Sequence, residues 1–97
     1  MERLTQLPEK GNEYFVEEST VRKTNKGYSG PAIQRLGIYE NALQKLMVRL
    51  ENIESEVQRY KEDGREKSVL FRELLGKKFL VKEMIDLLLE GNGGNGT

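Results

Sequence analysis

The chain has 97 residues, which is enough for one domain with a modest hydrophobic core. Its 16 basic and 16 acidic residues cancel, which argues against a general nucleic-acid coat, because such a protein needs a marked basic excess. The chain has no His and no Cys and so lacks the commonest general base, thiol nucleophile and transition-metal ligands. We therefore expect a protein that is not an enzyme and has no catalytic residue, metal site or cofactor.

The chain also lacks the apolar segments that direct a protein to membranes. Its first residues contain no apolar core of the kind found in signal peptides. The longest apolar runs, such as residues 87–89, are far shorter than the roughly 20 residues of a membrane span. We expect no contact with membranes and a location in the cytoplasm.

Residues 1–30 are predicted to be an irregular segment, because Pro and Gly residues interrupt any regular pattern. Aromatic and β-branched residues gather at positions 14–16 and 19–21. Such residues favour extended backbone, so a short strand or hairpin is expected here.

Residues 31–62 carry the clearest helical pattern. Apolar residues recur at alternating spacings of three and four over about four heptads, which is typical of a coiled-coil seam. Pro31 suits the first position of a helix, and Ser29 or Gly30 can cap it. The seam consists of Leu36, Tyr39, Leu43, Leu46, Leu50, Ile53, Val57 and Tyr60.

A second helix is predicted over residues 65–90. Gly64 favours the left-handed backbone conformation that ends a helix, and Asp63 with Glu66 fits a capping box for the next one. Ser68 is an alternative cap. Since a short linker makes two helices antiparallel neighbours, we expect a mainly α fold built on a long antiparallel helical hairpin.

The second helix is apolar on more than one side. A single narrow seam on the partner helix cannot cover all of these residues, so another surface must bury the remainder. Either the N-terminal segment or another subunit provides that surface, and we favour a homo-oligomer. The Gly- and Asn-rich residues 91–97 are expected to form a disordered tail.

A first basic cluster lies between Thr20 and Tyr39, a stretch without acidic residues. A Gly-containing turn that leads into a helix N-terminus presents free amide N–H groups, and nearby cations and an aromatic ring would add affinity for a phosphate or nucleotide. The alternative is an ordinary helix cap beside a solvated basic loop. The candidate ligand-binding residues are Arg22, Lys23, Lys26, Tyr28, Ser29 and Arg35.

A second basic cluster surrounds the predicted start of the second helix. It would form a phosphate or nucleic-acid contact strip, or it would only solubilise one helix edge. In a simple hairpin the two clusters lie at opposite ends, so oligomerisation would be needed to bring them together. The candidates in this second cluster are Arg65, Lys67, Ser68, Arg72 and Lys78.

Parts of the sequence resemble short proteins encoded by phages and prophages of Gram-positive bacteria. The resemblance rests on the opening Met-Glu-Arg-Leu-Thr, on the Arg-Leu-Gly-Ile-Tyr-Glu segment at residues 35–40, and on residues 64–74. It covers about a third of the chain in short pieces and implies a genomic neighbourhood more than an activity. Small non-enzymatic phage proteins commonly act against host defence systems, either by sequestering cyclic nucleotide signals or by binding a defence protein.

Three functions follow as hypotheses. The first is an anti-defence protein that sequesters a phosphate-containing nucleotide, often a cyclic one in host immunity. The second is a protein–protein inhibitor of a host defence complex, similar in action to anti-CRISPR proteins, that works through a helical face. The third, a nucleic-acid-binding accessory protein, is disfavoured by the zero net charge.

Overall fold

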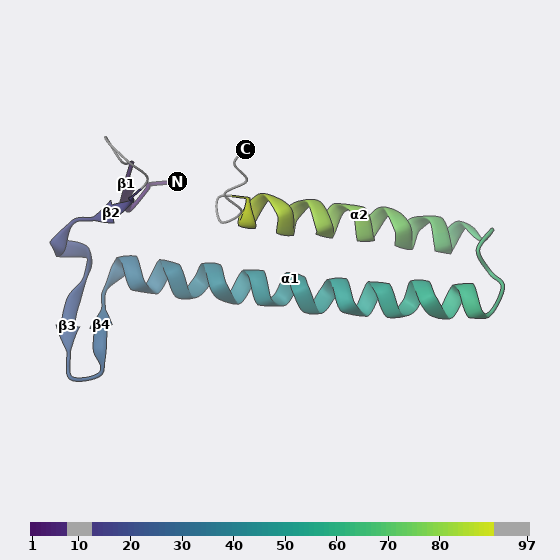
Figure 1. Ribbon diagram of the computed structural model, residues 1–97, viewed down its shortest axis with the longest axis horizontal. Helices are drawn as coiled ribbons and strands as arrows, with labels where there is room; N and C mark the ends of the chain where they lie inside the picture. Colours follow the sequence, from purple (N-terminus) through teal and green to yellow (C-terminus); the bar gives the residue numbers. More distant parts are fainter. Residues whose placement is uncertain (8–12, 91–97) are drawn as a thin grey trace. The chain divides into compact units, whose positions relative to one another are not determined.

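The computed structural model describes residues 1–7 and 13–90 and is mainly helical (Figure 1). Two long helices, α1 (Pro31–Glu62) and α2 (Val69–Leu89), pack as an antiparallel hairpin, and short strands precede them. The predicted hairpin with a short β segment is therefore confirmed. The predicted tail at 91–97 lies outside the described residues.

The contacts divide the chain into two compact units, Met1–Asn41 and Ala42–Thr97. The division falls inside α1 and not at residue 30, where the predicted N-terminal segment ends, because the first turns of α1 make their contacts with that segment. We call Met1–Asn41 the head unit and Ala42–Thr97 the hairpin unit.

The head unit contains two small antiparallel hairpins. In the first, β1 (Thr5–Gln6) pairs with β2 (Phe15–Val16). In the second, β3 (Arg22–Thr24) pairs with β4 (Gly27–Ser29). The extended backbone predicted near residue 15 is therefore present.

The backbone between the two hairpins differs from the prediction of a strand over residues 19–21. Glu18–Thr20 forms a short 3-10 helix, η1. The backbone N–H of Thr20 donates to the Glu17 carbonyl at 2.9 Å, and its hydroxyl donates to the same oxygen at 2.6 Å. A local side-chain hydrogen bond of this kind competes with strand pairing, which explains why β-branched residues do not form a strand here.

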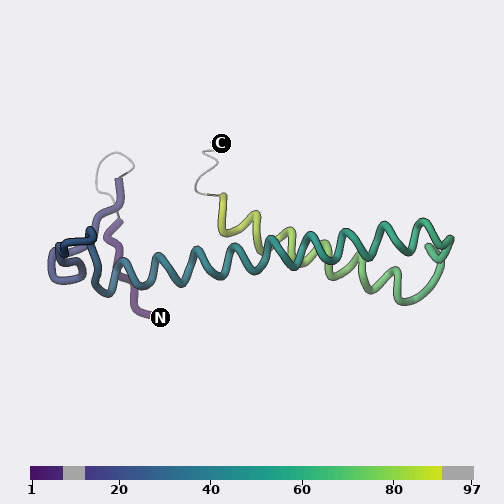
Figure 2. The backbone as a smooth tube through the Cα atoms, turned by 90° about the horizontal axis from the view of Figure 1, so that it is seen from below, coloured from purple at the N-terminus to yellow at the C-terminus, as the bar shows by residue number. Residues whose placement is uncertain are grey.

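The hairpin unit holds the largest hydrophobic core in the described chain. Ile53 and Val57 of α1 pack against three buried residues of α2, namely Phe71, Val81 and Ile85. Figures 1 and 2 show the two helices running side by side over this region. The core is flanked by Leu43, Leu46, Leu50, Tyr60, Leu74 and Leu89. The predicted seam is thus used from Leu43 onward, whereas Leu36 and Tyr39 contribute to the head unit.

α1 ends in a Schellman motif at Gly64, which has the predicted left-handed φ of 70°. The Gly64 N–H donates to the Lys61 carbonyl at 3.1 Å, and the Arg65 N–H donates to the Tyr60 carbonyl at 2.8 Å. The Arg65 guanidinium lies 4.4 Å from the centre of the Tyr60 ring, a cation–π contact that takes the place of the usual apolar contact of this motif.

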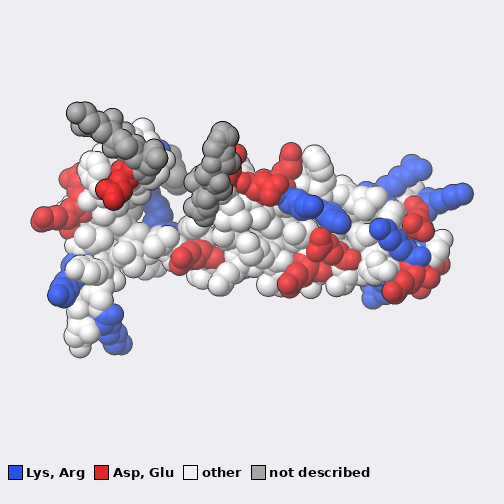
Figure 3. All heavy atoms as spheres, viewed as in Figure 1, with Lys and Arg blue, Asp and Glu red and all other residues white. Residues whose placement is uncertain are grey.

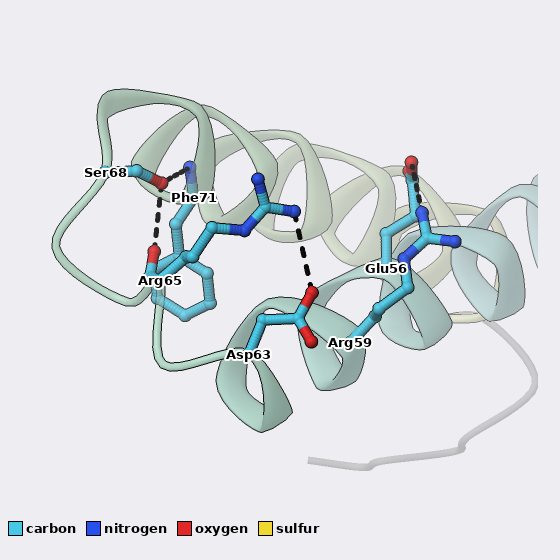
Figure 4. Close-up of polar contacts among 6 residues, drawn as sticks. All are labelled: Glu56, Arg59, Asp63, Arg65, Ser68 and Phe71. Carbon is cyan, nitrogen blue, oxygen red and sulfur yellow. Dashed lines mark hydrogen bonds and ion pairs between the residues drawn. The ribbon is translucent and has the colours of Figure 1, made fainter.

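α2 begins at Val69, four residues later than predicted, because Ser68 provides its cap (Figure 4). The Ser68 hydroxyl accepts a hydrogen bond from the Phe71 N–H at 3.1 Å and donates to the Arg65 carbonyl at 2.9 Å. The capping box predicted at Asp63 does not form, since the Asp63 carboxylate pairs with Arg65 at 3.7 Å. Of the two predicted caps, the second is correct.

Substituting Ser68 by Ala should lower the free energy of unfolding by about 1 kcal/mol, since the Phe71 N–H loses its acceptor. Chemical denaturation followed by circular dichroism measures this loss. The matched control is Ser55→Ala in the exposed middle of α1, where Ala is the better helix former and stability should rise slightly. Equal effects of the two substitutions would contradict the cap.

Within residues 1–7 and 13–90, no helix combines the length and the apolar character needed to cross a membrane.

Candidate binding surface

The β3–β4 hairpin places four of the predicted site residues on one projecting ribbon. Thr24 closes its two-residue loop, because its hydroxyl accepts from the Lys26 N–H and donates to the Gly27 carbonyl, both at 3.1 Å. Lys23 is paired in register with Tyr28, so these two side chains are cross-strand neighbours. We call Arg22, Lys23, Lys26 and Tyr28 the basic ribbon.

The cations of the basic ribbon are not paired with carboxylates of the described residues. Arg22, Lys23 and Lys26 are exposed, and none of them forms an ion pair with any other residue that the structure describes. Tyr28 is 64% exposed. In the view of Figure 3 the ribbon shows basic and no acidic side chains. A cation that is not paired with a carboxylate of its own chain remains available to attract the negative charge of another molecule. The basic ribbon is therefore suited to binding an anionic surface.

The predicted anion-binding turn before α1 has a different structure. Gly27, Tyr28 and Ser29 form strand β4, so their backbone belongs to a hairpin and not to an open loop. Ser29 is half-buried and lies opposite Arg22. Ser29 therefore does not belong to the exposed surface.

Gly30 explains this arrangement. Its φ is 121°, and a Cβ at this position would lie 2.5 Å from the Thr20 carbonyl oxygen. The glycine thus allows the backbone to pass η1 closely on its way into α1. Glycine is thus required at position 30 for close packing of the backbone, and its presence there does not indicate a phosphate-binding turn.

Arg35 lies apart from the ribbon, on the side of α1 that faces the N-terminus. Its guanidinium donates a hydrogen bond to the Glu2 carbonyl. It lines a groove of about 640 Å³ in the head unit together with Arg3 and mostly apolar residues such as Leu4, Val16 and Leu36. Arg3 is also engaged, with the Thr5 hydroxyl at 3.1 Å and with the Tyr14 ring. Since both guanidinium groups already have partners, the groove offers a ligand few free polar groups.

The second predicted cluster is divided among local contacts. Ser68 caps α2, Arg65 contacts Tyr60 and Asp63, and Lys78 pairs with Glu54 at 3.8 Å. Lys67 and Arg72 are exposed and make no ion pair within residues 1–7 and 13–90. The cluster therefore contributes two free cations of the hairpin unit and no continuous phosphate-binding strip.

Sequence reasoning recognised the second apolar stripe of α2 but did not identify its members. Seven apolar residues of this helix are more than 40% exposed. Their positions could be found only once the buried side was known, because a helix that is apolar on several sides does not reveal which side packs. They are Val69, Leu70, Leu75, Phe79, Leu80, Met84 and Leu87.

The part of the chain that the structure describes contains no group of three or more acidic side chains arranged to hold a metal ion. Comparison with protein-family models, with curated proteins and with solved structures finds no match for the chain. The functional argument therefore depends on the chemistry of the residues themselves.

Proposed function

We propose that the chain is a non-enzymatic inhibitor that binds an acidic surface of another protein through the basic ribbon. The observation that carries this proposal is the set of three exposed cations without carboxylate partners beside the exposed ring of Tyr28. Arg and Tyr are enriched among the residues that dominate binding energy at protein interfaces. Free cations add attraction to an acidic partner and speed association with it.

The shape of the ribbon favours a macromolecule over a free nucleotide. Small ligands are held in concave sites that bury most of their surface. Tyr28 is 64% exposed and its neighbours Lys23 and Lys26 are exposed as well, so the ribbon is a raised surface. Sequestration of a phosphate-containing nucleotide is therefore the alternative function.

The phage-like segments of the sequence support a bacterial defence protein as the target. Two of the segments that carry the resemblance, residues 1–5 and 35–40, lie in the head unit with the basic ribbon, and the third, residues 64–74, lies in the hairpin unit. The net charge of zero supports a protein over a nucleic acid, since the chain has no basic excess with which to neutralise a phosphate backbone. Inhibition would then result from occupying a surface that the defence complex needs.

The target can be identified by photocrosslinking. A photoreactive phenylalanine analogue replaces Tyr28 in chains expressed in strains that each carry one defence system, and a control chain carries it at Lys45 on α1. We expect one defence protein to crosslink at position 28 and not at 45. We also expect phage infection to be restored only in that strain.

Reversing two ribbon charges should abolish this binding. The variant Arg22→Glu/Lys23→Glu should weaken affinity for the identified protein at least about 30-fold, because each like-charge contact with an acidic surface is unfavourable. The variant Lys45→Glu/Arg49→Glu changes the net charge by the same amount on α1 and should bind as the parent chain does. Titration calorimetry measures both affinities.

The outcomes separate the hypotheses. Equal weakening by both double variants would show that the ribbon is not the contact. A shift in melting temperature with a cyclic nucleotide, lost in the ribbon variant, would support nucleotide sequestration instead.

A further inference from the structure

α2 carries a row of exposed apolar residues outside the packed core. Val69, Leu80, Met84 and Leu87 recur at helical spacings, and their side chains are 47% to 68% exposed. The row also includes Gly76, one turn before Leu80. We call these five residues the outer row. Val69, Gly76 and Leu87 lie opposite the packed positions of α2. Leu80 and Met84 border the groove between α2 and α1, beside Val81.

No contact within a single chain requires glycine at position 76. A Cβ added there meets no atom within 4 Å, so neither close packing nor an unusual backbone angle requires glycine at this position. Glycine inside a helix is also less stable than alanine. Its position in the middle of an exposed apolar row is explained if a bulky side chain of another molecule packs directly against the bare backbone.

The charges beside the outer row identify that molecule. Arg72, Glu83 and Glu90 are separated by 11 and 7 residues, which aligns them along one edge of the row. The edge is therefore positive toward the start of α2 and negative toward its end. Neither Arg72 nor Glu83 forms an ion pair among the described residues. An antiparallel copy of the same helix would place each positive part beside a negative part.

We infer that a second copy of this chain packs on the outer row, with the two α2 helices antiparallel and related by a two-fold axis. One register satisfies all the observations. It places Gly76 opposite Leu80 of the second copy, Val69 opposite Leu87, and Arg72 next to Glu83. Because a two-fold axis repeats each contact, the pair gains two glycine–leucine contacts and two ion pairs.

This register also accommodates Glu73, the charged residue that interrupts the row. Lys77 follows it by one turn at the opposite edge, so the two can pair along the helix. A parallel pairing would instead bring the edge that carries Arg72 beside the opposite edge of the second copy, where Lys77 lies. The Arg72–Glu83 ion pairs would then be lost, which makes the antiparallel arrangement the favoured one.

A charge exchange on the full chain tests the register. Sedimentation equilibrium should show a dimer, and Arg72→Glu or Glu83→Arg alone should weaken association about 10-fold or more. The double variant Arg72→Glu/Glu83→Arg should restore it, because the two charges exchange places. A chain that is monomeric at every concentration would overturn the proposal, as would a dimer that none of these variants changes.

Gly76→Ala provides a second measurement, with effects of opposite sign. The added methyl group should raise the melting temperature of the dilute monomer, because alanine is the better helix former. It should also weaken dimerisation, because it would fill the space that the side chain of Leu80 of the second copy occupies. Gly37→Ala is the matched control. Gly37 also lies inside a helix with no atom within 4 Å of an added Cβ, so it should stabilise the monomer without changing association. Equal association of the two alanine variants would show that no backbone approaches Gly76.

Discussion

Replacing Phe71 by Ala is expected to lower the free energy of unfolding of the hairpin unit by about 3 kcal/mol. Phe71 is 7% exposed, and its ring lies 6.2 Å from that of Tyr60 in the core between the helices. Removing it loses the buried aromatic surface and leaves a cavity near the turn. Because few residues form this core, one large side chain provides an unusually large share of its stability.

Phe79→Ala is the matched control for that experiment. Phe79 lies in the same helix and undergoes the same chemical change, but it is 62% exposed. It should therefore cost less than about 1 kcal/mol in denaturant unfolding of the dilute monomer. A similar loss of stability for both variants would mean that Phe71 is not the residue on which the two helices pack.

Gly30→Ala should unfold the β3–β4 hairpin, which leads into α1 in the head unit, while the hairpin unit stays folded. The new Cβ would meet the Thr20 carbonyl oxygen at 2.5 Å, and the φ of 121° is unfavourable for an L-residue. Backbone strain and the clash together should cost about 3 kcal/mol or more. Hydrogen exchange measured by NMR should show lost protection in β3 and β4 and unchanged protection in α2.

Gly37→Ala again serves as the control, since its added Cβ has open space. It should leave exchange in both units unchanged or slower. Retained protection of β3 and β4 in Gly30→Ala would contradict the tight passage of the backbone beside η1. Because the basic ribbon is held by these strands, Gly30→Ala should also abolish binding of the crosslinked protein.

Dimerisation through α2 would give the assembly two basic ribbons. Two linked sites raise the overall avidity for a partner with repeated acidic surfaces by about 10² to 10⁴ when both can bind at once. A weak contact through each ribbon could then still inhibit a multisubunit complex. The single variants Arg72→Glu and Glu83→Arg, which weaken the dimer, should accordingly reduce inhibition without changing the affinity of a single ribbon.

The local chemistry of the sequence was sufficient to predict the helical hairpin. The apolar seam, Pro31 at the start and Gly64 at the end specify α1, because each acts within one or two turns of helix. The Schellman motif at Gly64 is equally local. These signals predict the antiparallel arrangement without knowledge of any distant contact.

Only the structure showed at which residue α2 begins. Both Asp63 and Ser68 are suitable caps by residue type, and the choice between them depends on which side chain reaches a free N–H group. The Phe71 N–H lies within reach of the Ser68 hydroxyl, whereas Asp63 is held by Arg65.

The candidate site depended on tertiary structure to a greater extent. Eleven basic or polar residues formed two clusters in the sequence. Lys78 and Arg35, however, have partners far along the chain, Glu54 and Glu2, which only the tertiary structure could reveal. The sequence by itself determined the helices, because helical signals act over a few residues. Only the tertiary structure decided which cations stay free and which apolar side of α2 stays exposed, because burial and ion pairing depend on residues far apart in the chain.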